Sequence, residues 1–153
     1  MRISDFLRPD FVLPSLAARD VEGVVQEVSA CAELAGLGSA DVIAEKLLER
    51  ERSHSTVIGM GLAIPHATVP GLPGTVIGVA LAREPVQYGP EGVAPASTFF
   101  VLLSPPGSER EHVKLLARIC RLGHHVGFLE RLGETESGED ILRLIESVDS
   151  LHV

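Results

Sequence analysis

Two apolar runs place the strongest limit on how this chain can fold. Residues 75–81 (TVIGVAL) and 98–103 (TFFVLL) are short, rich in β-branched and aromatic residues, and separated by turn-forming segments. This pattern predicts two buried strands. Because a buried strand needs other elements packed against it, the rest of the chain must supply a cover for the sheet.

Helical periodicity on both sides of these runs supplies that cover. Apolar residues recur at helical spacing over about 20–34, 39–52, 109–122, 129–132 and 140–148, with Ser39 and Ser108 as N-caps. Weaker strand patterns lie at 12–16, 62–64 and 86–88, the last as a short edge strand. Alternating helices and strands predict an α/β (α+β) sandwich. We expect a single domain over residues 1–153.

Composition excludes several classes of function. The net charge is −8, from 13 basic and 21 acidic residues, whereas nucleic-acid binding calls for the opposite sign. No apolar run is long enough to span a membrane and the N-terminal residues contain no apolar region typical of a signal peptide, so we expect a cytoplasmic protein without membrane insertion. Cys31 and Cys120 lack CxxC spacing, which predicts reduced thiols and neither a disulfide framework nor a zinc site. We expect no cofactor.

The segment STVIGMGLAIPH, residues 55–66, holds the candidate reactive residue. Gly59 and Gly61 permit a tight turn, and residues 62–64 follow as a short strand. Pro65 has no amide donor and ends the ladder. His66 is therefore expected where a strand ends, on a rigid support. On composition alone, a histidine beside an apolar run is more often a satisfied structural residue.

The wider pattern resembles the EIIA domains of the bacterial phosphoenolpyruvate-dependent sugar phosphotransferase system (PTS), of the fructose, mannitol and nitrogen-regulatory type. The resemblance covers about residues 2–148 and is greatest to stand-alone nitrogen-regulatory members. The matching motifs are Arg50-Glu51, Ser55-Thr56, Gly59, Gly61, Ala63-Ile64-Pro65-His66, the second histidine in EHVKLLARI (His112), and the N-terminal ISDFL.

The resemblance implies a mixed sheet of about five strands flanked by helices, the PTS EIIA type-2 fold. It also implies that His66 accepts a phosphoryl group on Nε2, with His112 as a supporting histidine. A histidine with this role must be neutral, and its other ring nitrogen should donate to a fixed carbonyl. Arg50 would stabilise the phosphate, because its planar charged fork suits phosphate oxygens.

Several of these residues have a second reading. Arg50 could equally be a solvated charge at the end of a helix, and His112 a polar residue near a helix start. Ser55, Thr56, Gly59 and Gly61 either bind phosphate or shape the turn; we favour the turn for Ser55 and leave Thr56 open. The chain departs from the family pattern at four positions, where His54, Val57, Ala67 and Thr68 make the loop stiffer and bulkier.

The preferred function is a phosphoryl carrier. It would take its phosphoryl group from a histidine phosphocarrier protein (HPr or NPr) and pass it to a downstream EIIB domain, or use it to signal to a regulated protein. The alternative is a degenerate interaction module that no longer transfers phosphate. A metal site built from His54, His66 and His112 lacks any H-E-x-x-H spacing, and a serine hydrolase lacks the G-x-S-x-G turn.

Overall fold

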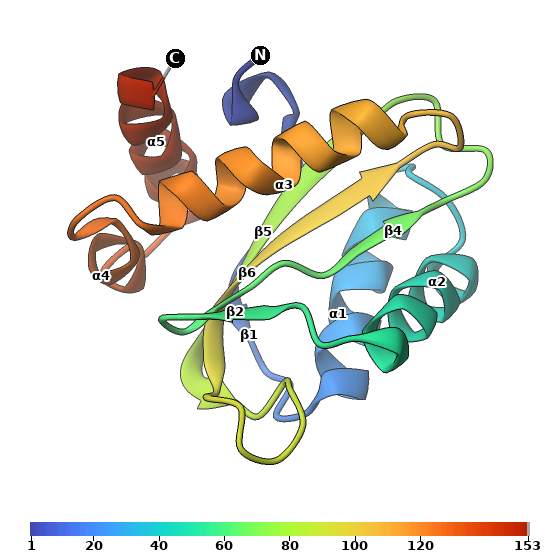
Figure 1. The fold of residues 1–153 in the computed structure, drawn as a ribbon, viewed down its shortest axis with the longest axis horizontal. Helices are drawn as coiled ribbons and strands as arrows, with labels where there is room; N and C mark the ends of the chain where they lie inside the picture. Colours follow the sequence, from blue (N-terminus) through green and yellow to red (C-terminus); the bar gives the residue numbers. More distant parts are fainter. Residues whose placement is uncertain (153) are drawn as a thin grey trace.

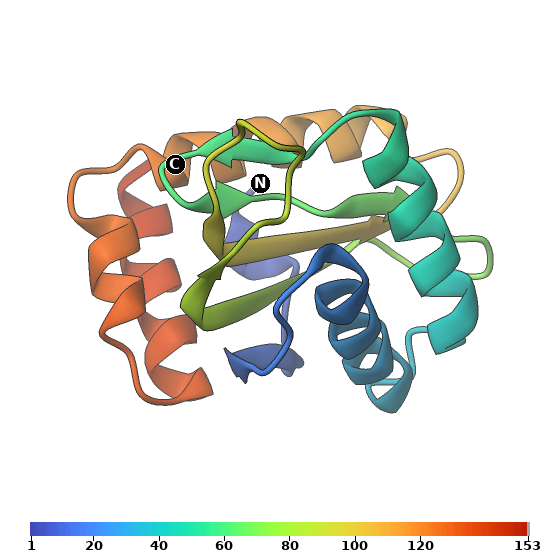
Figure 2. The ribbon, with the colours of Figure 1, turned by 90° about the horizontal axis from the view of Figure 1, so that it is seen from below.

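One mixed β-sheet runs through the molecule with helices on both of its faces (Figures 1 and 2). The computed structural model describes residues 1–152. Its strands are β1 (Leu7–Leu16), β2 (Val57–Gly59), β3 (Leu62–Ala63), β4 (His66–Thr68), β5 (Val76–Val86) and β6 (Ala96–Ser104). Its helices are α1 (Val21–Leu34), α2 (Ala40–Ser53), α3 (Glu109–Gly123), α4 (Phe128–Gly133) and α5 (Gly138–Asp149), with 3₁₀ turns η1 (Ile3–Asp5) and η2 (Ser150–His152).

Strand β6 is the axis of the sheet. The strand order is β1-β5-β6-β3-β2, and β4 pairs with the other half of β6. Strands β5 and β6 are antiparallel, β1 runs parallel to β5, and both β3 and β4 run parallel to β6. The predicted fold class is thus confirmed, with six strands in place of about five.

Two apolar cores, one on each face of the sheet, explain why apolar and polar residues do not alternate along most of β5 and β6. Ile77 and Val79 of β5 and Phe100 of β6 face a core shared with α3, α4, α5 and η1. Ala80 and Phe99 face the opposite core, which α1 and α2 cover. Because both faces of these strands are covered, residues 76–82 of β5 and every residue of β6 except Ser97 are buried, as in strands that are packed on two sides.

The five predicted helices are confirmed to within about two residues at each end. The strand predictions were less accurate. Strand β1 begins at Leu7, and the segment predicted as a separate edge strand near Val86 is instead the end of β5, paired with Ala96. Ser39 and Ser108 occupy the N-cap positions, but neither side chain caps its helix.

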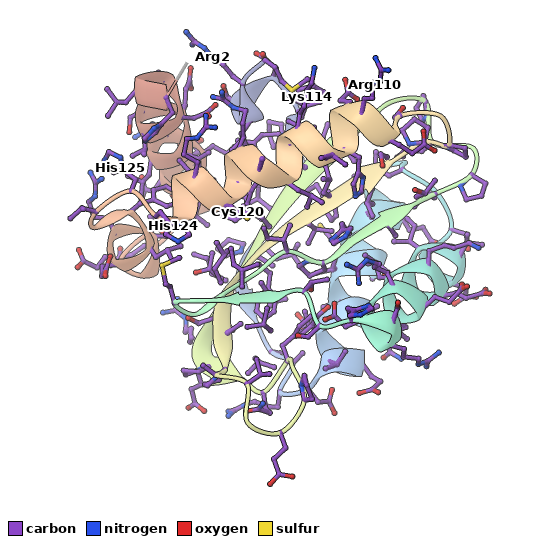
Figure 3. All side chains as sticks on the ribbon, in the orientation of Figure 1. Arg2, Arg110, Lys114, Cys120, His124 and His125 are labelled. Carbon is purple, nitrogen blue, oxygen red and sulfur yellow. The ribbon has the colours of Figure 1, made fainter. Side chains whose placement is uncertain are left out.

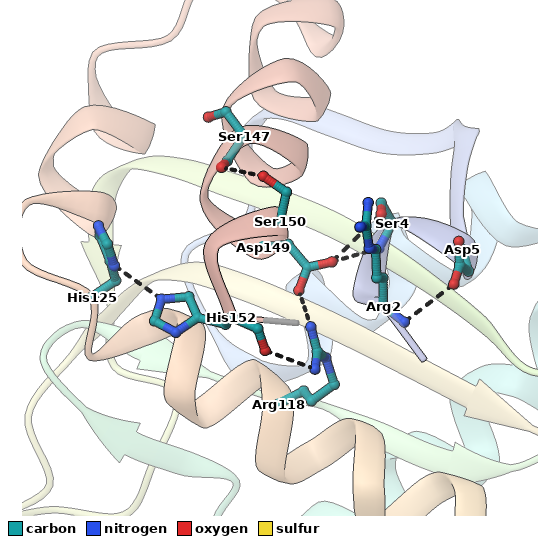
Figure 4. Close-up of polar contacts among 9 residues, drawn as sticks. All are labelled: Arg2, Ser4, Asp5, Arg118, His125, Ser147, Asp149, Ser150 and His152. Carbon is teal, nitrogen blue, oxygen red and sulfur yellow. Dashed lines mark hydrogen bonds and ion pairs between the residues drawn. The ribbon is translucent and has the colours of Figure 1, made fainter.

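The two ends of the described chain meet beside α3 (Figure 4). Asp149 accepts hydrogen bonds from the backbone N of Ser4 (3.2 Å) and from Nη2 of Arg118 (2.8 Å). Arg118 also donates to the carbonyl of His152, whose ring contacts Nδ1 of His125 at 3.0 Å. No helix within residues 1–152 combines the length and apolar character needed to cross a bilayer.

Candidate functional site

Three of the seven residues predicted to form the site lie around one open cavity. Arg50 of α2, His66 of β4 and His112 of α3 line a space of about 580 Å³, at the edge of the sheet where β4 runs between the two helices (Figure 1). Lys46, Glu49, Ala67, Thr68 and Pro70 complete the lining. The structure therefore brings together residues that are up to 62 positions apart in the sequence, counted from Arg50 to His112.

A backbone carbonyl fixes the imidazole ring of His66. Nδ1 lies 2.7 Å from the carbonyl oxygen of Ile64. Because a carbonyl can only accept, Nδ1 carries the proton and Nε2 keeps its lone pair. Burial lowers the pKa of His66 to about 4; the bond to Ile64 opposes this shift, while the charge of Arg50 adds to it. The ring is therefore neutral at physiological pH, with the Nε2 lone pair free.

The expected position of His66 past the end of a strand is corrected. Strand β3 covers only Leu62–Ala63, and His66 opens the next strand, β4. Both strands run along β6 in the same register, with Leu62 opposite Thr98 and His66 opposite Leu102. The ladder breaks between them at Ile64 and Pro65, because proline has no amide hydrogen to donate.

His112 stands next to His66. Their ring centroids are 5.1 Å apart and the rings are inclined by 60°. His112 lies in the first turns of α3, where Nδ1 is 2.6 Å from Oγ of Ser104. Burial and the charge of Arg50 lower the pKa of His112, and Glu109 opposes that shift. With Nδ1 occupied, Nε2 is the ring nitrogen left available to a ligand.

Two positively charged residues of α2, Arg50 and Lys46, line the cavity. Nη1 of Arg50 donates to the carbonyl of His54 at 2.9 Å, a contact with a neutral group that leaves the guanidinium charge uncompensated. Lys46 lies one helical turn earlier and approaches Glu49 at 3.8 Å. Sequence reasoning missed Lys46, although its i,i+4 spacing from Arg50 puts both residues on one helix face.

Glu51, to which sequence reasoning gave no role, holds the loop that carries His66. Its carboxylate accepts from the backbone N (2.6 Å) and from Oγ1 (2.7 Å) of Thr56. The carbonyl of Thr56 accepts from the backbone N of Ile64 at 3.0 Å, and Ile64 in turn orients His66. Glu51 is thus linked to the ring of His66 through two intervening residues, Thr56 and Ile64. The buried hydroxyl of Thr56 donates to Glu51 as part of this link.

The remaining motif residues shape turns. Oγ of Ser55 accepts from the backbone N of Val57 at 3.2 Å. Gly59 (φ 105°) and Gly61 (φ 79°) have left-handed backbone conformations at the β2–β3 hairpin. Gly61 lies beside Thr98, and at about 3.3 Å per residue along β6 this is roughly 13 Å from the level of Leu102 and His66. The structure does not bring these glycines to the cavity.

The departures from the family pattern fit the backbone without strain. Val57 lies in β2 and Ala67 in β4, and neither has a positive φ that would require glycine. His54 has an exposed side chain that lines a different cavity, of about 480 Å³, together with Tyr88. His54 therefore does not join His66 and His112 in the three-histidine metal site considered above.

The sequence of this chain matches a family model and a known relative over most of its length. The family model described as "Phosphoenolpyruvate-dependent sugar phosphotransferase system, EIIA 2" matches residues 5–148. The chain is 32% identical over 146 residues to a nitrogen regulatory protein of Bradyrhizobium diazoefficiens, covering 95% of each protein.

Solved structures show the same fold. The nitrogen regulatory protein IIA-Ntr of Neisseria meningitidis superimposes with a TM-score of 0.85 at 24% identity, covering 94% of this chain and 98% of that one. Mannitol enzyme IIA of Escherichia coli, in complex with phosphorylated enzyme IIB, gives 0.78 at 18% identity, covering 92% and 99%. On its sequence match and its fold, this chain belongs to the EIIA type-2 family of the phosphoenolpyruvate-dependent sugar phosphotransferase system.

Proposed function

We propose that this protein is a phosphoryl carrier that accepts a phosphoryl group on Nε2 of His66 from a histidine phosphocarrier protein, HPr or NPr. The hydrogen bond from Nδ1 of His66 to the carbonyl of Ile64 is the observation that supports this most directly, because it leaves Nε2 as the nucleophile. In the transfer, the P–N bond to the donor histidine breaks as the bond from phosphorus to Nε2 forms. The donor nitrogen keeps the electron pair of the broken bond.

The surrounding side chains meet the needs of this transfer. Phosphoryl transfer depends on in-line placement and on neutralising the equatorial oxygens. Arg50 and Lys46 supply positive charge from α2, and His112 supplies a ring nitrogen from α3. These groups stabilise the charge that reaches the cavity with the phosphoryl group.

The phosphoryl group then passes to an EIIB domain or acts as a regulatory mark on this protein. The solved complex of mannitol enzyme IIA with phosphorylated enzyme IIB supports an EIIB partner. The relatives described as nitrogen regulatory proteins support the regulatory use, and we favour it. The protein works as a single domain.

The test is intact-mass analysis after incubation with phosphoenolpyruvate, enzyme I and the phosphocarrier. Wild-type protein should gain one acid-labile phosphoryl group, and His66→Ala should gain none. His124→Ala is the matched control, since His124 is an exposed histidine at the far end of α3 (Figure 3). If wild-type protein takes up no phosphoryl group from either phosphocarrier, the interaction module replaces the carrier as the function.

A further inference from the structure

Ser104 is a buried polar residue to which the phosphoryl-carrier function assigns no role. It ends β6, and its side chain is 1% exposed. Its hydroxyl oxygen lies 2.6 Å from Nδ1 of His112, across the loop that connects β6 to α3. Within residues 1–152 the hydroxyl has no other hydrogen-bond partner, so its interaction with His112 is a specific one.

Both sides of this contact are held in place. The carbonyl of Ser104 accepts from the backbone N of Val69 at 2.8 Å, and β4 pairs Thr68 with Ser104. On the helix side, the backbone N of His112 donates to the carbonyl of Ser108 at 2.9 Å. Glu111 accepts from Oγ1 of Thr75 at 2.6 Å, which fastens the start of α3 to the start of β5.

The two histidines of the cavity have partners of different kinds. The carbonyl that holds His66 can only accept, which fixes one tautomer. The hydroxyl that holds His112 can either donate or accept. When His112 is neutral, the buried hydroxyl hydrogen of Ser104 is satisfied only by donation to Nδ1, because it has no other acceptor within residues 1–152. This favours the tautomer with the ring proton on Nε2. When His112 is charged, Nδ1–H donates to Ser104, and Nε2 still carries a proton.

We propose that Ser104 is a positioning residue for His112, and that its hydroxyl keeps an N–H group on Nε2 of His112 directed at the phosphoryl group in both protonation states. The inference rests on the proposed function, because it supposes that a phosphoryl group occupies the cavity. Without the hydroxyl, neutral His112 could adopt the Nδ1–H tautomer, which would present a lone pair to the phosphoryl oxygens and repel them.

Reversal of this hydrogen bond lets His112 take up a proton when His66 is phosphorylated. The incoming negative charge favours the imidazolium, and the proton comes from solvent in the open cavity. Glu109 of α3 also favours the charged ring, and Glu49 of α2 lines the same cavity. Burial and the charge of Arg50 oppose the charged ring and lower the pKa of His112, and Lys46 lines the same cavity.

Nitrogen-15 NMR of the histidine rings tests the positioning role in the free protein. Wild-type His112 should show the neutral Nε2–H tautomer, and Ser104→Ala should show a mixture of tautomers. Ser104→Thr keeps the hydroxyl and should restore the wild-type spectrum. Ser29→Ala is the matched control, because Ser29 is equally buried and its hydroxyl has no hydrogen-bond partner.

The same variants are then phosphorylated with phosphoramidate and with the phosphocarrier. Ser104→Ala should react about tenfold more slowly, the effect of losing one oriented hydrogen bond, and the Thr variant should react at the wild-type rate. If wild-type protein reacts and Ser104→Ala matches it in both rate and His112 tautomer, the positioning role is overturned. If wild-type protein itself takes up no phosphoryl group, the proposed function fails instead.

Discussion

Nη1 of Arg50 donates a hydrogen bond to the carbonyl oxygen of His54 at 2.9 Å, across the last turn of α2. The partner is a neutral backbone group, and within residues 1–152 Arg50 forms no ion pair with a carboxylate. The guanidinium is thus held at the cavity by a contact that neutralises none of its charge. A substitution at His54 that keeps the backbone should preserve this arrangement.

Arg50→Ala should therefore slow phosphoryl uptake by about a hundredfold, the usual cost of removing one preorganised group that stabilises developing charge. Time-resolved intact-mass analysis measures the rate. Lys114→Ala is the control for loss of a cation, since Lys114 projects from α3 away from the sheet and the cavity (Figure 3). His54→Gly should also retain the wild-type rate; a loss equal to that of Arg50→Ala would contradict this account of the contact.

The lowered pKa of His66 predicts an unusual dependence on pH. With a pKa of about 4, this ring stays neutral in the folded protein while an unfolded histidine, with a pKa near 6.5, takes up a proton. Between these values the unfolded state binds more protons, so stability falls as the pH falls from about 6.5 toward 4. Urea unfolding at pH 7 and pH 5 should show a smaller loss for His66→Gln than for wild-type protein.

Glu51→Gln tests the link from α2 to the reactive ring. Glutamine offers one acceptor oxygen where the carboxylate accepts from both the backbone N and the hydroxyl of Thr56. We expect a loss of about 2 kcal/mol in the free energy of unfolding, because these hydrogen bonds are made to a charged group. Urea denaturation measures it. Glu45→Gln, an exposed carboxylate of the same helix, should leave stability unchanged, and equal effects of the two variants would contradict the link.

The ion pair between Arg118 and Asp149 should contribute strongly to stability. The two side chains are 14% and 2% exposed, so Asp149→Ala leaves a guanidinium nearly buried without its partner. The expected cost is about 3 kcal/mol, read from thermal or urea unfolding. Arg143→Ala, which breaks pairs whose arginine is 75% exposed, should cost less than about 0.5 kcal/mol. Similar losses in the two variants would rule out burial as the cause.

Sequence periodicity was sufficient to predict the helices and the two central strands, because the spacing of their apolar residues follows both the period of the element and the side of it that is buried. It was less informative for residues 57–68, where β3 and β4 pair with the distant strand β6 and β2 pairs only with β3. Pro65 was predicted to end the ladder, but it only interrupts pairing with β6, which resumes at His66. That the same β6 strand continues to pair beyond it, through His66, depends on the length of β6 and is not visible locally.

The residues of the candidate site also fall into those that the sequence predicted and those that it did not. Motif resemblance selected His66, Arg50 and His112, which all line the cavity. Whether those residues perform the expected chemistry stays a prediction. The groups that orient these side chains were not predicted, because the carbonyl of Ile64 and the hydroxyl of Ser104 belong to residues of ordinary type. Only the folded chain shows that they lie against a ring nitrogen.

The hydrogen bond from Ser4 to Asp149 brings the first and last elements of the described chain together. The same arrangement of elements in space could therefore be reached with a different order along the chain. Every residue that lines the cavity comes from positions 46–112, whereas the two ends of the described chain are joined on the opposite side of α3. A circular permutant that links these ends and opens the turn at residues 71–74 would keep α2, β4 and α3 in place. The positions at which the chain begins and ends can thus be changed in this architecture without altering the residues that line the cavity.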